Sequence, residues 1–317
     1  MEKSKAKKIK RRLLISFGSL FLFMNIIAFF HAYKLTHFAD ENSVKTKSSN
    51  QLSTSEKVKT ILFGVNNPKP VNTSFPTQKF ETVFLKSNKE IECWSIKKGN
   101  SKGTVVLFHG YNGNKSSMLD KSDEFLKLGY STFLVDFMGS GNSEGNQTTI
   151  GFKEAEEVKT VFDYLKKNTS EDLFLFGTSM GAVAIMKAEN DYQLNPKGII
   201  LECPFGTMYQ TTATRFSNMN VPAFPMAGLL LFWGGTQNGF WAFGHEPIEY
   251  AKKITCPTLL LYGEKDNRVS REEIDMIYEN LLGEKDLKTY PKAGHENYLK
   301  KYKEEWTTDV GNFLRRN

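Results

Sequence analysis

From about residue 80 to its end, the chain alternates short apolar runs with segments whose apolar residues recur at helical spacing. Continuous apolar runs such as 104–110 are typical of strands buried on both faces, and segments such as 150–167 predict amphipathic helices. This alternation predicts a mainly parallel sheet with helices on both faces. Two neighbouring runs, 80–87 and 90–97, predict an antiparallel hairpin at one edge. Further strands are predicted at 131–137, 172–177, 198–205, 256–263 and 287–291, and further helices at 180–189, 272–282 and 298–315.

Residues 204–246 interrupt this alternation. The segment is rich in Gly and aromatic residues, has little strand or helix periodicity, and lies between two predicted core strands. Such an insertion predicts a cap over a site. Packing against the core and partial contact with a membrane are the alternatives.

Residues 13–33 contain no Asp, Glu, Lys or Arg. A helix of this length spans a hydrocarbon core of about 30 Å, so the segment predicts a transmembrane anchor. A cleaved signal peptide is the alternative, but its apolar region is shorter and Phe30-His31-Ala32 is a poor cleavage sequence. The basic tail, residues 1–12, predicts a cytoplasmic N-terminus with the body on the periplasmic or extracellular side.

The net charge of +7 is concentrated in that tail, which holds seven of the 42 Lys and Arg and one of the 35 Asp and Glu. The remainder is nearly neutral, so we expect no nucleic-acid binding. Residues 34–79 are rich in Ser, Thr, Asn, Lys and Pro, and predict a flexible linker to a globular domain at 80–317. The composition leaves the oligomeric state open.

Three cysteines, Cys93, Cys203 and Cys256, are scattered in apolar surroundings and predict buried free thiols. No Cys and His pair has the spacing of metal ligands, so we expect no metal and no other cofactor.

Two segments match G-x-S-x-G, the signature of a nucleophilic serine on a sharp turn: GNSEG at 141–145 and GTSMG at 177–181. Ser179 follows an apolar strand and precedes a helix of small residues, which is the context this turn needs. Ser143 lies in a Gly-rich polar stretch with no helix directly after it. We therefore predict Ser179 as the nucleophile.

A serine nucleophile needs a base, and the base needs a carboxylate to orient it. His295 lies between the last predicted strand and the last helix and is the favoured base, with His245 as its rival. Asp266 follows a predicted strand and is the favoured orienting group. Glu264 and Glu284 are the alternatives. The oxyanion hole needs two backbone N–H groups, for which we predict Met180 and Tyr111.

Together these motifs resemble the α/β-hydrolase superfamily, and in particular its serine aminopeptidase and monoacylglycerol-lipase-like branch. The resemblance covers residues 80–315 and rests on HGYNGN, DFMGSGNSEG, GTSMG, LYGEKD and AGH, in that order. GNSEG then corresponds to the end of a family loop that holds no nucleophile. Met138 stands where the family usually has Arg, so any ion pair made by that Arg is absent here.

The resemblance implies an α/β-hydrolase fold with a cap, here joined to one transmembrane helix. We expect a membrane-anchored serine hydrolase that cleaves carboxylic esters of a small acyl or lipid-like substrate through an acyl-enzyme. A serine peptidase and a non-catalytic binding scaffold are the alternative functions.

Overall fold

The computed structural model describes residues 2–47 and 52–317, so residue 1 of the predicted tail and residues 48–51 of the predicted linker lie outside it. Its centre is an eight-stranded sheet with the strand order β1-β2-β4-β3-β5-β6-β7-β8. The pairs β1–β2 and β2–β4 are antiparallel, and the other neighbours are parallel. The strands are β1 (Glu81–Lys86), β2 (Glu90–Ile96), β3 (Thr104–Phe108), β4 (Ser131–Val135), β5 (Leu173–Thr178), β6 (Gly198–Glu202), β7 (Thr258–Gly263) and β8 (Lys285–Tyr290).

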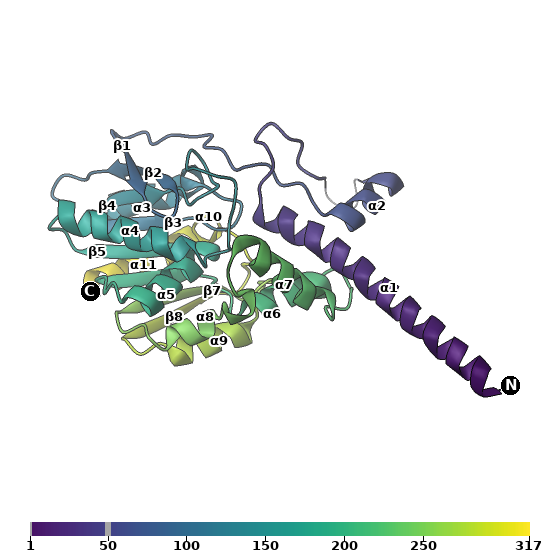
Figure 1. The fold of residues 1–317 in the computed structure, drawn as a ribbon. Helices are drawn as coiled ribbons and strands as arrows, with labels where there is room; N and C mark the ends of the chain where they lie inside the picture. The colour runs from purple at the N-terminus through teal and green to yellow at the C-terminus, as the bar shows by residue number, and fades with distance from the viewer. Residues whose placement is uncertain (1, 48–51) are drawn as a thin grey trace.

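Helices cover both faces of the sheet (Figure 1). One apolar core joins one face to α4 (Glu154–Asn168), α5 (Met180–Tyr192), α8 (Pro247–Ala251) and α9 (Arg271–Asn280). A second core joins the other face to α3 (Leu119–Leu128), α10 (Tyr298–Lys301) and α11 (Lys303–Arg316). The predicted mainly parallel α/β architecture is confirmed, including the antiparallel hairpin at its edge. All three cysteines are buried and free.

The segment predicted as a cap is helical. It contains α6 (Met208–Ser217), α7 (Met226–Asn238) and the short 3-10 helix η3 (Ala242–Gly244). The sequence of α7, MAGLLLFWGGTQN, is apolar around most of its circumference. A helix of this kind has no polar stripe to give it a periodic pattern, which is why its helical character was not predicted.

A 35-residue helix, α1 (Glu2–Thr36), projects from the body and ends against the cap (Figure 1). Its stretch Lys5–Thr36 is long and apolar enough to span a membrane, by length and composition. The last turns of α1 pack along α7, where Trp233 Nε1 donates to the Asn25 side-chain oxygen at 3.2 Å and Gln237 Nε2 donates to the Phe29 carbonyl at 2.9 Å. The apolar helix is therefore joined to the cap by both packing and hydrogen bonds.

The described parts of the predicted flexible linker contact one another and the body at several points, although their helix has no buried residue. They include α2 (Thr54–Phe63), and a β-bridge joins Ala39 to Pro68. Another bridge joins His37 to Gln147 of the body, and Lys69 Nζ donates to the carbonyl oxygen of Ser143 at 2.7 Å. Because these contacts are made by backbone and by scattered polar side chains, the polar composition of the segment did not reveal them.

Candidate active site

Ser179 occupies a sharp turn between β5 and α5. Its backbone has a φ of +51°, in a region that residues other than Gly rarely adopt. A side chain at Gly177 would collide with the backbone of Gly181 and Ala182, and one at Gly181 would collide with the carbonyl oxygen of Phe108. The two flanking glycines therefore allow the strand, the turn and the helix to approach closely, and they hold Ser179 at the N-terminus of α5.

The structure brings the three predicted triad residues together. His295 Nε2 lies 3.1 Å from Ser179 Oγ, and His295 Nδ1 lies 2.7 Å from Asp266 Oδ2. In the neutral imidazole this arrangement has Nδ1–H donating to the carboxylate while Nε2 accepts from the serine hydroxyl. The Asp266 side chain is fully buried and that of His295 is 12% exposed. Their catalytic roles remain predictions.

Two loops hold Asp266 and His295 in place. The N–H of Lys265 donates to the carbonyl of Ala293 at 2.8 Å, which joins the loop after β7 to the loop after β8. The other Asp266 oxygen, Oδ1, accepts from the N–H groups of Arg268 and Val269 at 2.7 and 3.0 Å. Asp266 is thus fixed by its own loop, and its Oδ2 is left to orient His295.

Cys203 lies beside this triad. Its sulfur, a carboxylate oxygen of Asp266 and a ring nitrogen of His295 lie within 4.8 Å of one another. These three groups could hold a metal ion only if His295 gave up a hydrogen bond to Ser179 or Asp266. Burial alone would lower the pKa of His295, but the neighbouring Cys203 and the Asp266 carboxylate more than offset it and raise that pKa above 6.5.

Of the two predicted oxyanion donors, Met180 directly follows the nucleophile and Tyr111 lies on the loop after β3. A side chain at Gly110 would contact Ser179 Cβ at 3.7 Å, so the loop that carries Tyr111 reaches the nucleophile. Within the described parts of the chain, neither the N–H of Tyr111 nor that of Met180 donates a hydrogen bond. Free N–H groups beside a nucleophile are what an oxyanion hole requires. Their function stays a prediction.

The other histidines of the body are buried and bond to partners outside the triad. His109 Nε2 accepts from the N–H of Phe137 at 3.1 Å, and its Nδ1 lies 2.8 Å from the carbonyl of Gly110. His245 contacts the Tyr250 hydroxyl and the Ile150 carbonyl, each at 3.0 Å, and burial lowers its pKa to about 4. Both residues are therefore neutral and brace turns of the backbone.

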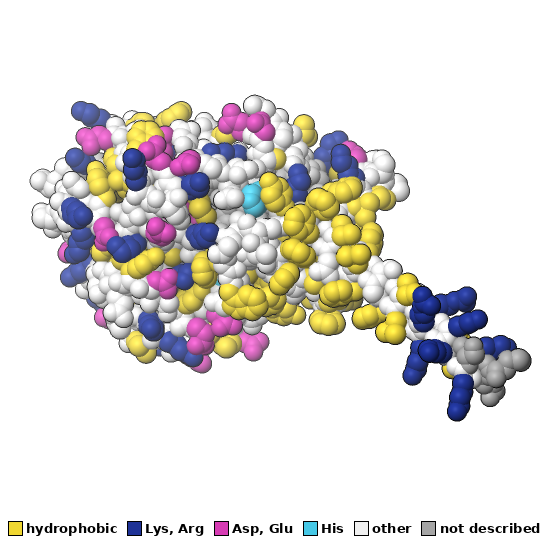
Figure 2. All heavy atoms as spheres, in the orientation of Figure 1, with side chains coloured by type: hydrophobic (Ala, Val, Ile, Leu, Met, Phe, Trp, Pro, Cys, Tyr) yellow, Lys and Arg dark blue, Asp and Glu magenta, His cyan; other side chains and the backbone are white. Residues whose placement is uncertain are grey.

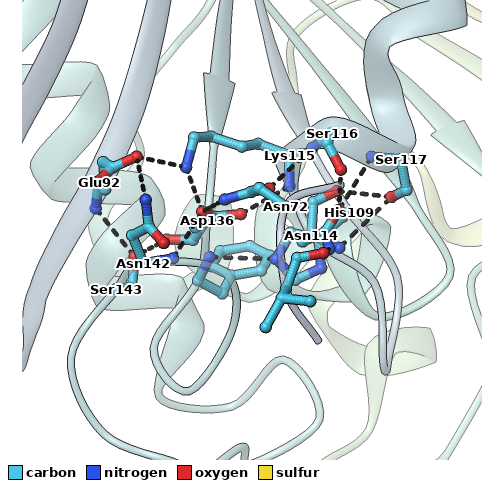
Figure 3. Close-up of polar contacts among 12 residues, drawn as sticks. Asn72, Glu92, His109, Asn114, Lys115, Ser116, Ser117, Asp136, Asn142 and Ser143 are labelled. Atoms are coloured by element: carbon cyan, nitrogen blue, oxygen red, sulfur yellow. Dashed lines mark hydrogen bonds and ion pairs between the residues drawn. The ribbon is translucent and has the colours of Figure 1, made fainter. Parts of the chain in front are cut away.

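Ser143 lies in a buried polar network on the other side of β3 (Figure 3). Its Oγ donates to the carbonyl of Asp136 at 2.7 Å and accepts from the N–H of Glu92 at 2.9 Å. The serine is 1% exposed, and none of the polar partners that the structure describes for it is a histidine. Ser143 fastens the loop after β4 to β2.

The centre of this network is the side chain of Lys115, a residue that the sequence did not single out. Lys115 Nζ contacts Glu92 at 2.8 Å and pairs with the Asp136 carboxylate (Figure 3). It also lies 4.4 Å from the centre of the Trp94 ring. Lys115 thus supplies the cation that pairs with the buried Asp136 carboxylate. It also anchors the loop that follows Tyr111. Its signal in the sequence was a lone Lys within a polar turn.

The sequence is similar to those of known hydrolases. A family model described as serine aminopeptidase, S33, matches residues 99–230. An uncharacterized Bacillus subtilis protein, YqkD, is 25% identical over 71% of this chain and 75% of its own length. The lysophosphatidylserine lipase ABHD12 of Macaca fascicularis is 25% identical over a region that covers 53% of this chain and 42% of the lipase.

Solved structures resemble the body of the chain. The Pyrococcus furiosus esterase Pf2001 superposes with a TM-score of 0.67 and 25% identity, covering 78% of this chain and 96% of the esterase. An esterase from Exiguobacterium antarcticum has a TM-score of 0.56 and 20% identity, covering 74% of this chain and all of that structure. The latter shows a shared fold alone.

Proposed function

We propose that this chain, a member of the α/β-hydrolase superfamily, is a membrane-anchored serine hydrolase that cleaves carboxylic esters with an apolar acyl part. The observation that carries the proposal is the hydrogen-bonded series from Ser179 through His295 to the buried Asp266. A serine oxygen on a strained turn, with its proton directed at an oriented imidazole, is suited to attack on an acyl carbonyl.

In the proposed reaction, Ser179 Oγ bonds to the substrate carbonyl carbon while His295 Nε2 takes the serine proton. The N–H groups of Tyr111 and Met180 bind the oxygen that becomes negative. When this tetrahedral species collapses, the bond to the leaving alcohol breaks and His295 returns the proton to the alcohol oxygen. His295 then takes a proton from water as the water attacks the acyl-enzyme, and the second collapse releases the acid and restores Ser179.

A mostly apolar groove near the oxyanion loop agrees with the choice of acyl group, since its lining residues Leu35 and Arg215 contact Tyr111. It lies between the end of α1 and the cap, is partly open to solvent, and encloses a cavity of about 50 Å³. Thr149 lies in its wall, and the preceding Thr148 contacts the sulfur of Met180 at 3.4 Å. The groove is lined by Ala32, Leu35, Thr36, Thr149, Ile150, Met208, Thr212, Arg215, Leu230, Leu231, Gly234, Phe240 and Ala242.

The helix proposed as the anchor also contacts the oxyanion loop. The Tyr111 hydroxyl donates to the carbonyl oxygen of Leu35, near the end of α1, at 2.8 Å. Residues 25–33 belong to the apolar stretch that spans the membrane in this proposal, and they pack along α7. The cap would therefore lie against the outer part of the bilayer, and exposed apolar side chains of α1 and the cap form one surface there (Figure 2).

Such a placement would let an ester enter the groove directly from the membrane. Two similar proteins, an esterase and a lysophosphatidylserine lipase, agree with this class of substrate. The basic N-terminal end of α1 favours a cytoplasmic N-terminus and a body on the opposite side.

A panel of substrates on the full chain in neutral detergent tests the proposal. We expect hydrolysis of p-nitrophenyl butyrate and faster hydrolysis of p-nitrophenyl palmitate, with no release from aminoacyl p-nitroanilides. Preferred cleavage of the anilides would favour a peptidase, and no turnover by the folded chain would favour the binding scaffold.

Two glycines of α7 provide a matched pair of variants for the groove. A side chain at Gly234 would extend toward Ala32 and Thr36 of α1, whereas one at Gly228 would meet nothing within 4 Å. Gly234→Leu should therefore reduce palmitate hydrolysis relative to butyrate, and Gly228→Leu should leave the ratio unchanged. Equal ratios in the two variants would contradict the groove as the acyl site.

A further inference from the structure

Arg215 is a cation in the wall of the groove that has no acidic partner. It extends from α6, is half-buried, and its guanidinium carbon lies 5.8 Å from the centre of the Tyr111 ring. Among the residues that the structure describes, it forms no salt bridge and no hydrogen bond through its side chain. It is also the only charged residue that lines the groove within that part of the chain.

The buried cations elsewhere in the body are paired. Lys115 contacts Glu92 at 2.8 Å, Lys121 contacts Glu202 at 3.5 Å, and Lys187 contacts Asp191 at 2.7 Å. Pairing is the general rule because removing a charge from water without a partner is costly. Arg215 is half-buried rather than fully buried, and among the described residues it has no acidic partner of this kind.

The surroundings of Arg215 favour an anion. Burial lowers the pKa of the guanidinium, the Tyr111 hydroxyl opposes this shift, and the charge of Arg268 adds to it. Arg268 follows the loop of Asp266, and that loop contacts the cap where Asn218 Nδ2 donates to the Asn267 carbonyl at 2.6 Å. Two arginines whose charges interact therefore lie near the candidate active site, and a bound anion would relieve both the burial of Arg215 and its repulsion by Arg268.

We propose that Arg215 binds an anionic group of the substrate, so that the preferred ester is an amphiphile carrying a carboxylate or a phosphate. This inference rests on the proposed function and narrows its substrate class. A guanidinium presents two parallel N–H donors that match either anion. The apolar chain of the amphiphile would lie along α1 and α7, and the anionic group would lie at α6, beside Tyr111.

Kinetics on the full chain test this assignment. The substrates share one acyl chain: 1-acylglycerol as the neutral ester, 1-acylglycerol 3-phosphate, and the acyl ester of glyceric acid, which carries a carboxylate. Wild type should prefer one or both anionic esters. Arg215→Gln should lower kcat/KM on the preferred anionic ester about 30-fold or more, as when one partner of a desolvated charge pair is removed, and should lower it much less on the neutral ester.

Two further variants distinguish a direct contact between Arg215 and the anion from a long-range effect of positive charge near the site. Arg215→Lys keeps the charge and should recover part of the lost activity. Arg268→Gln removes a positive charge from an exposed side chain and should change the preference for the anionic ester less than threefold. Equal losses on neutral and anionic esters in Arg215→Gln, or equal effects of Arg215→Gln and Arg268→Gln, would overturn the assignment. The anionic ester whose kcat/KM falls more in Arg215→Gln shows whether Arg215 binds a phosphate or a carboxylate.

Binding to a Ser179→Ala chain keeps this test independent of turnover. Titration calorimetry in neutral detergent would compare 1-acylglycerol 3-phosphate, the acyl ester of glyceric acid and 1-acylglycerol. Tighter binding of an anionic ligand that disappears in Ser179→Ala/Arg215→Gln supports the assignment even if wild type hydrolyses no ester, in which case the proposed function fails alone. Equal binding of all three ligands by Ser179→Ala would overturn the assignment while leaving ester hydrolysis by wild type unaffected.

Discussion

Two segments of this chain share the pattern G-x-S-x-G and have opposite surroundings. Ser179 stands at the junction of β5 and α5 with a φ of +51°, and its oxygen lies 3.1 Å from His295. Ser143 is buried in a loop, where its hydroxyl both donates to and accepts from backbone groups. We infer from this difference that the five-residue pattern specifies only a tight turn. The elements before and after the turn decide whether its serine faces a base or fastens a loop.

Removing each hydroxyl in turn tests the different roles of the two serines most strongly. Ser179→Ala should lower kcat on an ester about 10⁵-fold or more, as nucleophile removal does in triad hydrolases, with little change in the free energy of unfolding. Ser143→Ala should keep the activity but cost about 1–3 kcal/mol of stability, because the N–H of Glu92 loses its acceptor. Ester kinetics and urea unfolding of both variants would measure this. Similar losses of activity in the two variants would contradict the comparison.

Asp266→Asn should have the next largest effect. The amide cannot hold the imidazole in the tautomer that accepts the serine proton, so kcat should fall about 10⁴-fold. The carboxylate is fully buried and bonds to backbone N–H groups, so unfolding must be measured in parallel. Activity within tenfold of wild type would mean that another group orients His295.

Lys115→Met tests the network that holds Ser143. The substitution leaves the Glu92 and Asp136 carboxylates without their cation, and should cost about 3–5 kcal/mol in the free energy of unfolding. Lys127→Met is the control, since that side chain is 63% exposed and should change stability by no more than about 1 kcal/mol. Equal unfolding midpoints in the two variants would show that the network contributes little.

The smallest expected effect is a shift along the pH axis. Because the pKa of His295 is raised above 6.5, a larger fraction of the base is protonated and inactive at a given neutral pH. We therefore expect kcat/KM on a neutral ester to rise with pH, with a midpoint above 6.5. Cys203→Ala removes one cause of the raised pKa and should move this midpoint to lower pH. A pH–rate profile checks both, and an unmoved midpoint would exclude an influence of Cys203.

The features that could be predicted from the sequence are those with a local signal. Buried strands appear as apolar runs, so the parallel sheet and its edge hairpin were predicted close to their observed bounds. The turn at Ser179 was predicted because the strand, the glycines and the helix are adjacent in the chain. His295 and Asp266 were predicted because the carboxyl ends of parallel strands meet at one edge of a sheet.

The features that were missed depend on contacts between distant segments. The bond from Tyr111 to Leu35 and the packing of α1 on α7 join residues whose local patterns do not reveal each other. Likewise, the sequence predicted Cys203 only as a buried thiol, and the structure places it beside His295. Arg215 is a single charge in an apolar segment, and its lack of an acidic partner becomes visible only when the groove is assembled.

The most direct test of the central claim is to label the full chain with a fluorophosphonate, which reacts with activated serines, and to locate the adduct by mass spectrometry. Wild type and Ser143→Ala should each carry one adduct on Ser179, and Ser179→Ala should carry none. An adduct on another serine, or no adduct on folded wild type that still hydrolyses esters, would contradict the assignment of Ser179 as the nucleophile.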